Sequence, residues 1–212
     1  MKTLFNYLFL SFLTISVTKA QTISGNLFQL TNQEIRLEGF NGLNTYSISK
    51  TVINEKGEFE LSYTTKDIGV GYLMSVDKKP LFVILSGEDI QLKGEALSFP
   101  ESISITKGEQ NKNFEQYAVA QPKRERALSA WGYLQKMYAG DSLFSIHSEP
   151  LKAIEEEQQR IKTEEKSFLN QLPKESYVRW FLPTRKLVSS VSTVAQYRPE
   201  EIPNEKADLV TS

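Results

Sequence analysis

The side chains that carry most enzyme chemistry are scarce in this sequence and stand apart from one another. The chain contains no cysteine, which removes thiol nucleophiles, disulfides and thiolate metal ligands. Its single histidine, His147, lies in a polar stretch where we expect a solvent-exposed loop side chain. A Ser-His-Asp triad would need His147 as its base, and no Gly-x-Ser-x-Gly sequence presents a nucleophile. We therefore expect no enzyme activity, catalytic residue, metal ligand or cofactor in this chain.

Glycines and carboxylates offer only weak alternatives. Gly69-Val70-Gly71 is too short for a dinucleotide-binding fingerprint, and no helical pattern follows it. Glycoside hydrolysis needs two carboxylic side chains in acid and base roles. The candidates for such a pair are Asp67, Glu88, Asp89 and Glu95. Nothing in their spacing selects two of them, so we interpret all four as solvated turn and strand residues.

The densest aromatic group is a candidate partner surface. It consists of Tyr177, Trp180 and Phe181. Packing in a core is one interpretation of this group. An exposed patch that anchors a protein partner is the other, because aromatic side chains often dominate the binding energy of interfaces. The densest charge runs, at 123–126 and 155–157, lie on helical patterns, and we interpret them as solvated faces.

The first 20 residues have the pattern of a cleavable secretory signal peptide. Lys2 provides a basic start, residues 4–17 are mainly apolar, and Thr18 and Ala20 put small residues at the −3 and −1 positions. The apolar stretch is shorter than the roughly 20 residues of a membrane-spanning helix, and an uncleaved anchor helix is the alternative. We expect cleavage after Ala20 and a periplasmic or otherwise exported protein.

Charge and hydropathy exclude several classes of partner. The chain has 25 basic and 26 acidic residues, and removal of Lys2 and Lys19 leaves 23 basic residues, a formal charge near −3. This balance gives no reason to expect nucleic acid or an anionic membrane as a partner. No later segment is long and apolar enough to span a bilayer, so we expect no stable membrane insertion after signal cleavage.

Residues 21–108 alternate apolar and polar side chains with a period of two, which is typical of strands. Clear examples surround Phe59 and Ile90, and residues 81–85 are apolar throughout, as in a strand buried on both faces. Turn-forming Gly and Asn separate the runs at 41–42, 54–57 and 86–89. About eight short strands without intervening helices predict an antiparallel β-sandwich or a barrel-like domain.

Residues 109–196 change to a helical period and predict an α-helical connector region. Pro122 interrupts the first apolar stripe, and we expect a new helix to begin there. A second stripe begins after Ser148, an expected N-cap, and ends at Pro173. A last helical pattern covers residues 177–194.

The C-terminal residues 197–212 are mostly polar and contain two prolines, so they predict a linker or a loose tail. The predicted division of the chain is then a signal peptide at 1–20, an antiparallel β domain at 21–108, a helical connector at 109–196 and the tail. The predicted fold class is α+β.

The strand and turn motifs of the first half resemble a known family. Ile23-Ser24-Gly25 opens the first strand, and residues 52–59 have the sequence V-I-N-E-K-G-E-F. Ser86-Gly87-Glu88-Asp89-Ile90 follows the apolar strand, and Ile105-Thr106-Lys107-Gly108 precedes the first helix. This arrangement resembles the N-terminal DUF4369-type domain of exported TlpA-like thiol-disulfide reductases of Bacteroidetes-type bacteria. The resemblance covers roughly residues 22–120 well and is moderate beyond them.

The resemblance implies an accessory module that precedes a thioredoxin-like domain. The family's active site is a Cys-x-x-Cys sequence in that later domain, and this chain has no cysteine to match it. We therefore expect a non-catalytic exported accessory or interaction module, as a shortened relative or the front part of a longer product. Its expected partner is a protein, such as a thioredoxin-like domain. The alternative is a small-ligand or glycan-binding β-sandwich that uses tyrosines such as Tyr46, Tyr63 and Tyr72.

Overall fold

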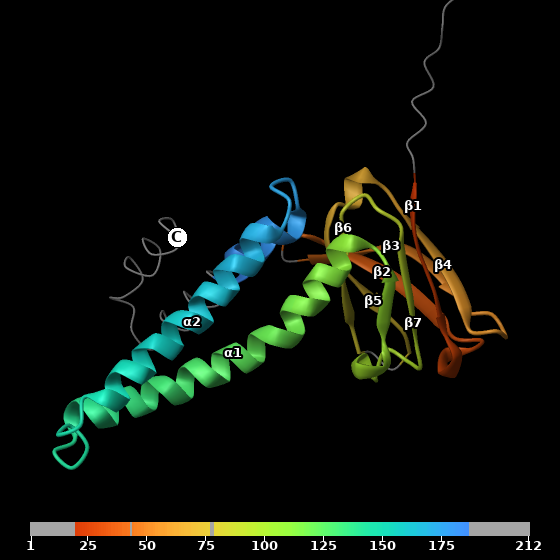
Figure 1. The fold of residues 1–212 in the computed structure, drawn as a ribbon. Helices are drawn as coiled ribbons and strands as arrows, with labels where there is room; N and C mark the ends of the chain where they lie inside the picture. The colour runs from red at the N-terminus through yellow and green to blue at the C-terminus, as the bar shows by residue number, and fades with distance from the viewer. Residues whose placement is uncertain (1–19, 43, 77–78, 187–212) are drawn as a thin grey trace, which may run out of the picture.

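The structure is a computed structural model that describes residues 20–42, 44–76 and 79–186. Figure 1 shows a β-sandwich followed by helices that extend away from it. The α+β class predicted from the sequence is confirmed. The predicted signal peptide up to residue 19, the helical pattern beyond residue 186 and the predicted tail lie outside the described residues.

The strands of the described part form two four-stranded sheets. The first sheet has the strand order β4-β1-β7-β8 and the second has the order β3-β2-β5-β6. The strands are β1 (Gln21–Leu27), β2 (Glu34–Asn41), β3 (Asn44–Val52), β4 (Glu58–Tyr63), β5 (Gly69–Met74), β6 (Leu81–Leu85), β7 (Ile90–Gly94) and β8 (Ser104–Lys107). Short 3-10 helices lie in the connections at Phe28–Leu30, Thr65–Asp67 and Pro100–Ser102.

The strand pairing is antiparallel with one exception. β1 and β7 run parallel, with Ile23 opposite Ile90, whereas the other pairs are antiparallel. A parallel pair needs a long crossover, and here the chain passes through the whole second sheet between β1 and β7. The expectation of antiparallel pairing is therefore corrected at this pair, because close spacing along the chain does not decide which strands become neighbours.

The three predicted turns make two kinds of connection: one joins strands within a sheet, and two join strands of different sheets. The turn at 41–42 joins the neighbouring strands β2 and β3, and Gly42 has a φ of +61°. The turns at 54–57 and 86–89 instead carry the chain from one sheet to the other. Gly57 and Gly87 have φ values of +79° and +83° there, in the left-handed region that glycine enters without steric cost.

The sandwich core is formed by the apolar phase of the alternating strands. Val83 and Leu85 of β6 join this core, whereas Ile84 points the other way and is buried against the helices. The prediction that β6 is buried on both faces therefore applies to its second half only, since Phe82 is about half exposed.

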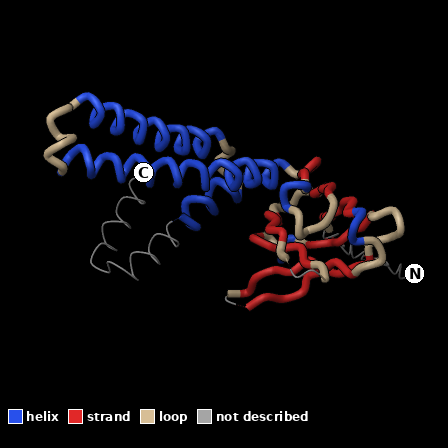
Figure 2. The backbone as a smooth tube through the Cα atoms, turned by 90° about the horizontal axis from the view of Figure 1, so that it is seen from below, coloured by secondary structure: helices blue, strands red, loops and turns tan. Residues whose placement is uncertain are grey.

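Two long helices form a hairpin that projects from the sandwich as an arm (Figures 1 and 2). These are α1 (Glu109–Gly140) and α2 (Glu149–Gln171), and a third helical stretch covers 177–186. The expected new helix at Pro122 is wrong, because α1 continues through this residue. Proline removes one backbone hydrogen bond and bends a helix without having to end it, and α1 changes direction part-way along its length in Figure 1.

The helices pack against the outer face of the second sheet through a second apolar cluster. Ile84 of β6 packs there with Tyr117 of α1. The segment after α2 adds Leu172, Val178 and Leu182, all of them buried. The helical part and the sandwich therefore share an apolar contact rather than only a linker.

Candidate functional site

The candidate site lies where the helices meet the second sheet, and a buried amide fixes this junction. Asn111, which is 3% exposed, donates from Nδ2 to the Ile84 carbonyl oxygen and accepts from the Ile84 N–H through Oδ1, both at 2.8 Å. β6 is the edge strand of its sheet. The Asn111 carboxamide thus forms hydrogen bonds with the backbone N–H and carbonyl of Ile84, which a neighbouring strand would otherwise pair with. It also holds the first turn of α1 against β6.

Two further side chains hold the backbone around this contact. The Glu88 carboxylate accepts from the N–H groups of Glu109 and Gln110, at 3.0 and 2.9 Å, and caps the N-terminus of α1. Gln110 Oε1 in turn accepts from the Ser176 hydroxyl and the Val178 N–H, both at 3.1 Å. The β6–β7 turn, the start of α1 and the start of the third helical stretch are therefore one hydrogen-bonded unit.

Three aromatic rings form a row across the outer face of the second sheet. Tyr72 of β5 lies opposite Phe82 of β6, with ring centroids 6.3 Å apart, and its centroid is 5.5 Å from that of Phe40. The Tyr72 hydroxyl donates to Glu38 Oε2 at 2.7 Å. This hydrogen bond, together with burial, raises the pKa of Tyr72. Phe40 and Phe82 keep nearly half of their surface exposed, so the row presents apolar rings to solvent.

The predicted partner surface is a second group of rings on the third helical stretch. Tyr177 stacks on Phe181 with centroids 5.7 Å apart, and Trp180 lies 5.6 Å from Tyr177. Tyr177 and Phe181 are partly buried against the second apolar cluster. Trp180 is 61% exposed. Core packing therefore describes Tyr177 and Phe181, whereas Trp180 is mainly open to solvent.

A groove of about 500 Å³ lies between these two groups of rings. It brings together aromatic side chains that are distant in sequence, namely Phe40, Tyr46, Phe82, Tyr177 and Phe181. Charged side chains on its lining are Lys66, Asp67 and Arg185. We call this the aromatic groove.

The acidic side chain of the groove is held in its ionised form. Asp67 Oδ1 accepts from the Tyr46 hydroxyl at 3.0 Å, and Oδ2 accepts from the N–H and the hydroxyl of Thr64, both at 2.8 Å. Burial alone raises the pKa of Asp67, but the hydrogen bonds from Thr64 and Tyr46 outweigh it and hold the pKa below its usual value. Because its pKa is lowered, this carboxylate stays ionised at neutral pH and is a weak base. It is therefore better suited to binding a polar or basic group of a ligand than to transferring protons.

The other carboxylates that the sequence offered for acid–base chemistry hold local structure. Glu88 caps α1, as described above. Asp89 accepts from the Lys107 ammonium at 3.0 Å and from a backbone N–H at 3.2 Å, and Glu95 accepts from Gln29 Nε2 at 3.0 Å. Within the ranges that the structure describes, no group of His, Cys, Asp or Glu side chains is arranged to hold a metal ion.

The tyrosines that the sequence offered for ligand binding have different positions. Tyr46 lines the aromatic groove and Tyr72 lies in the adjacent row. Tyr63 is only 1% exposed, its hydroxyl donates to the Glu88 carbonyl oxygen, and burial raises its pKa to about 12. Tyr63 is therefore a core residue and does not line the groove.

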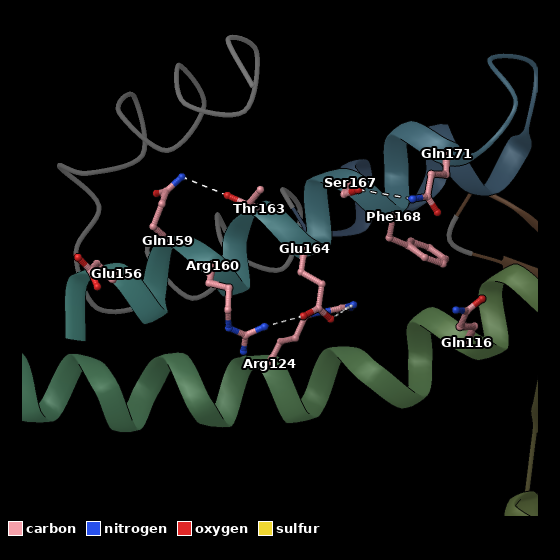
Figure 3. A pocket seen from close by; sticks show the side chains of 10 residues that line it. All are labelled: Gln116, Arg124, Glu156, Gln159, Arg160, Thr163, Glu164, Ser167, Phe168 and Gln171. Atoms are coloured by element: carbon pink, nitrogen blue, oxygen red, sulfur yellow. Dashed lines mark hydrogen bonds and ion pairs between the residues drawn. The ribbon is translucent and has the colours of Figure 1, made fainter. Parts of the chain in front are cut away.

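A second cavity, of about 650 Å³, lies between α1 and α2 and is lined mainly by polar side chains (Figure 3). Glu164 accepts from Arg124 and from Arg160, both at 3.0 Å, and Arg160 also pairs with Glu157 at 2.7 Å. The charged side chains of the lining are two arginines, Arg124 and Arg160, and two glutamates, Glu156 and Glu164, so their charges balance. This cavity therefore lacks the excess charge that would attract an ionic ligand, and the aromatic groove is the stronger candidate.

Comparisons with known proteins give no family assignment. No protein-family model matches the chain, and no curated protein matches it. Among solved structures, a 9R-lipoxygenase from Cyanothece PCC8801 is similar over 33% of this chain and 14% of its own chain, with 22% sequence identity and a TM-score of 0.23. A similarity this low carries no argument.

Proposed function

We propose that this protein is a non-catalytic exported interaction module that binds a protein partner through the aromatic groove. The observation that supports this proposal is the gathering of rings from β2, β6 and the third helical stretch on one groove. Phe40 and Phe82 of its lining are exposed, and the exposed Trp180 lies beside the groove, next to Tyr177. Exposed aromatic side chains that converge from separate elements are typical of interaction sites, because each ring buries a large apolar area on binding.

The setting of the groove favours a protein partner. Trp180, Phe40 and Phe82 are rigid anchors with few rotatable bonds, so their immobilisation costs little entropy. Lys66, Asp67 and Arg185 add charges of both signs beside them, which suits a polar rim around an apolar centre. The hydrogen bonds of the junction hold the two walls in place before a partner arrives.

The partner that we propose is a thioredoxin-like domain. The support is the resemblance of residues 22–120 to the DUF4369-type domains that precede such a domain in exported reductases. The signal peptide predicted for the first 20 residues fits the same compartment. Because this chain has no cysteine, the redox chemistry would belong to the partner, and this chain would position it.

Calorimetry with the full chain and a purified thioredoxin-like domain of such a reductase tests the proposal. We expect Trp180→Ala and Phe82→Ala each to weaken binding about 30-fold, the effect of losing an interface hot spot. Tyr133→Ala is the matched control, because Tyr133 is an exposed aromatic residue, at least as open to solvent as Trp180 and Phe82, but lies on the arm. No binding, or equal affinities for the control and for the variants in and beside the groove, would contradict the proposal.

A second candidate function is binding of a small ligand or a glycan in the same groove. Its volume of about 500 Å³ lies within the range of about 300–1,000 Å³ that is usual for small-molecule sites. Thermal unfolding in the presence of a panel of sugars and small metabolites distinguishes the two functions. A rise in melting temperature that is lost in Phe82→Ala would favour the ligand, and no rise with any compound would favour the protein partner.

A further inference from the structure

The tip of the helical arm carries an apolar surface that the groove does not explain. Residues 141–148 join α1 to α2 at the end of the arm that is farthest from the sandwich (Figures 1 and 2). Leu143 and Ile146 are 71% and 74% exposed there. Between Asp141 and Glu149 the loop contains no acidic or basic side chain other than His147. The centre of this loop thus exposes two aliphatic side chains and no acidic or strongly basic one, whereas the two helices of the arm carry many charged side chains.

The loop is ordered by its own backbone hydrogen bonds. The Leu143 N–H donates to Asp141 Oδ1 and the Ser145 N–H donates to the Asp141 carbonyl oxygen, both at 2.8 Å. The His147 N–H donates to the Phe144 carbonyl oxygen at 3.2 Å. The Phe144 ring packs on Tyr138 of α1, with centroids 5.4 Å apart. The aliphatic side chains are therefore held outward by a folded loop.

We propose that this tip inserts reversibly into the surface layer of a lipid bilayer. A convex loop of eight residues is too small for a stable protein interface, which buries about 800 Å² on each partner. A soft apolar medium accepts such a point without needing a matching pocket. Insertion is easier where backbone groups have partners inside the segment, and the N–H groups of Leu143, Ser145 and His147 have such partners in this loop.

The residues behind the tip fit the same arrangement. Tyr138 lies in the last turn of α1, and the exposed Tyr133 lies about 10 Å before the helix end at 1.5 Å per residue. Tyrosine at this depth is typical of the headgroup layer, where its ring and hydroxyl have different surroundings. Because the tip has no basic cluster, the proposed ligand is a neutral lipid surface, and binding should change little with salt.

Flotation with phosphatidylcholine vesicles tests the proposal on the full chain. We expect the double variant Leu143→Glu/Ile146→Glu to lower the partition coefficient at least about tenfold. The matched control is Val52→Glu/Val119→Glu, which puts the same charges at exposed aliphatic positions away from the tip. Circular dichroism confirms that both variants are folded, as expected for surface positions.

A site-specific probe identifies which part of the molecule enters the lipid. Because the chain has no cysteine, Ser145→Cys carries a single polarity-sensitive dye at the tip, and Ser129→Cys carries it on the side of the arm. We expect a blue shift with vesicles for the tip dye alone. Absence of vesicle binding, equal losses in the tip and control variants, or a tip dye that responds only to a protein would each overturn the proposal.

Discussion

Replacing Asn111 with alanine tests whether one buried amide seals the edge of the second sheet. The change removes both hydrogen bonds between the Asn111 side chain and the Ile84 backbone. The N–H and carbonyl groups of Ile84 are then buried without partners. Each such group costs about 1–3 kcal/mol, and the better helix propensity of alanine returns roughly 0.5 kcal/mol. We therefore expect Asn111→Ala to lower the free energy of unfolding by about 2–5 kcal/mol, a large part of the stability of an ordinary domain.

Urea unfolding followed by far-ultraviolet circular dichroism measures this loss. Asn113→Ala is the matched control, because Asn113 lies on the same turn of α1 and its side chain has no hydrogen bond to another described residue. We expect the control to stay within about 0.5 kcal/mol of the natural chain. Tryptophan fluorescence adds a second probe, since both tryptophans, Trp131 and Trp180, lie in the helical half.

Two results would refute the reasoning. If Asn111→Ala lowers the free energy of unfolding no more than Asn113→Ala does, the hydrogen bonds from the Asn111 carboxamide to β6 do not stabilise the fold. If fluorescence and circular dichroism report the same single transition with unchanged stability, the helices and the sandwich do not depend on this contact. A fluorescence transition that precedes the circular dichroism transition in Asn111→Ala would instead show that the helices detach first.

Three further predictions concern single positions in the sandwich and its junction. Glu88→Ala removes the cap of α1 and should lower the free energy of unfolding by about 0.5–2 kcal/mol in the same urea assay. Gly25→Ala puts a Cβ atom into the Leu92 carbonyl oxygen and should lower the free energy of unfolding by about 1–3 kcal/mol, with a lower melting temperature as the check. The pKa of Tyr63 is raised from 10.0 to about 12, so its neutral hydroxyl contributes stability that is complete below pH 10 and is lost as the pH rises through 12. Urea unfolding at a series of alkaline pH values should show a smaller loss of stability in Tyr63→Phe than in the natural chain, and an identical loss would contradict this cause.

The local pattern of the sequence predicts the elements well where each residue's neighbours decide its state. Alternation identifies the strands, and the ends of α1 at Gly140 and of α2 before Pro173 follow from helix-breaking residues. The buried position of Tyr63 was also available from the sequence, because it shares its phase with Phe59 and Leu61. Pro122 misled the prediction, since a packed helix tolerates one missing hydrogen bond.

The candidate site could not be predicted in the same way, because it depends on contacts between distant residues. Phe40 and Phe82 appear in the sequence as ordinary strand residues, and only the pairing of β2 and β6 with β5 places them in one row with Tyr72. Asn111 appears as an ordinary polar residue of a helix, yet it closes the strand that carries Phe82. The same first turn of α1, through Gln110, holds the start of the helical stretch that forms the other wall. The shape of the groove therefore depends on the polar contacts of the junction, and a prediction from local pattern that detects the rings without these contacts identifies only half of the site.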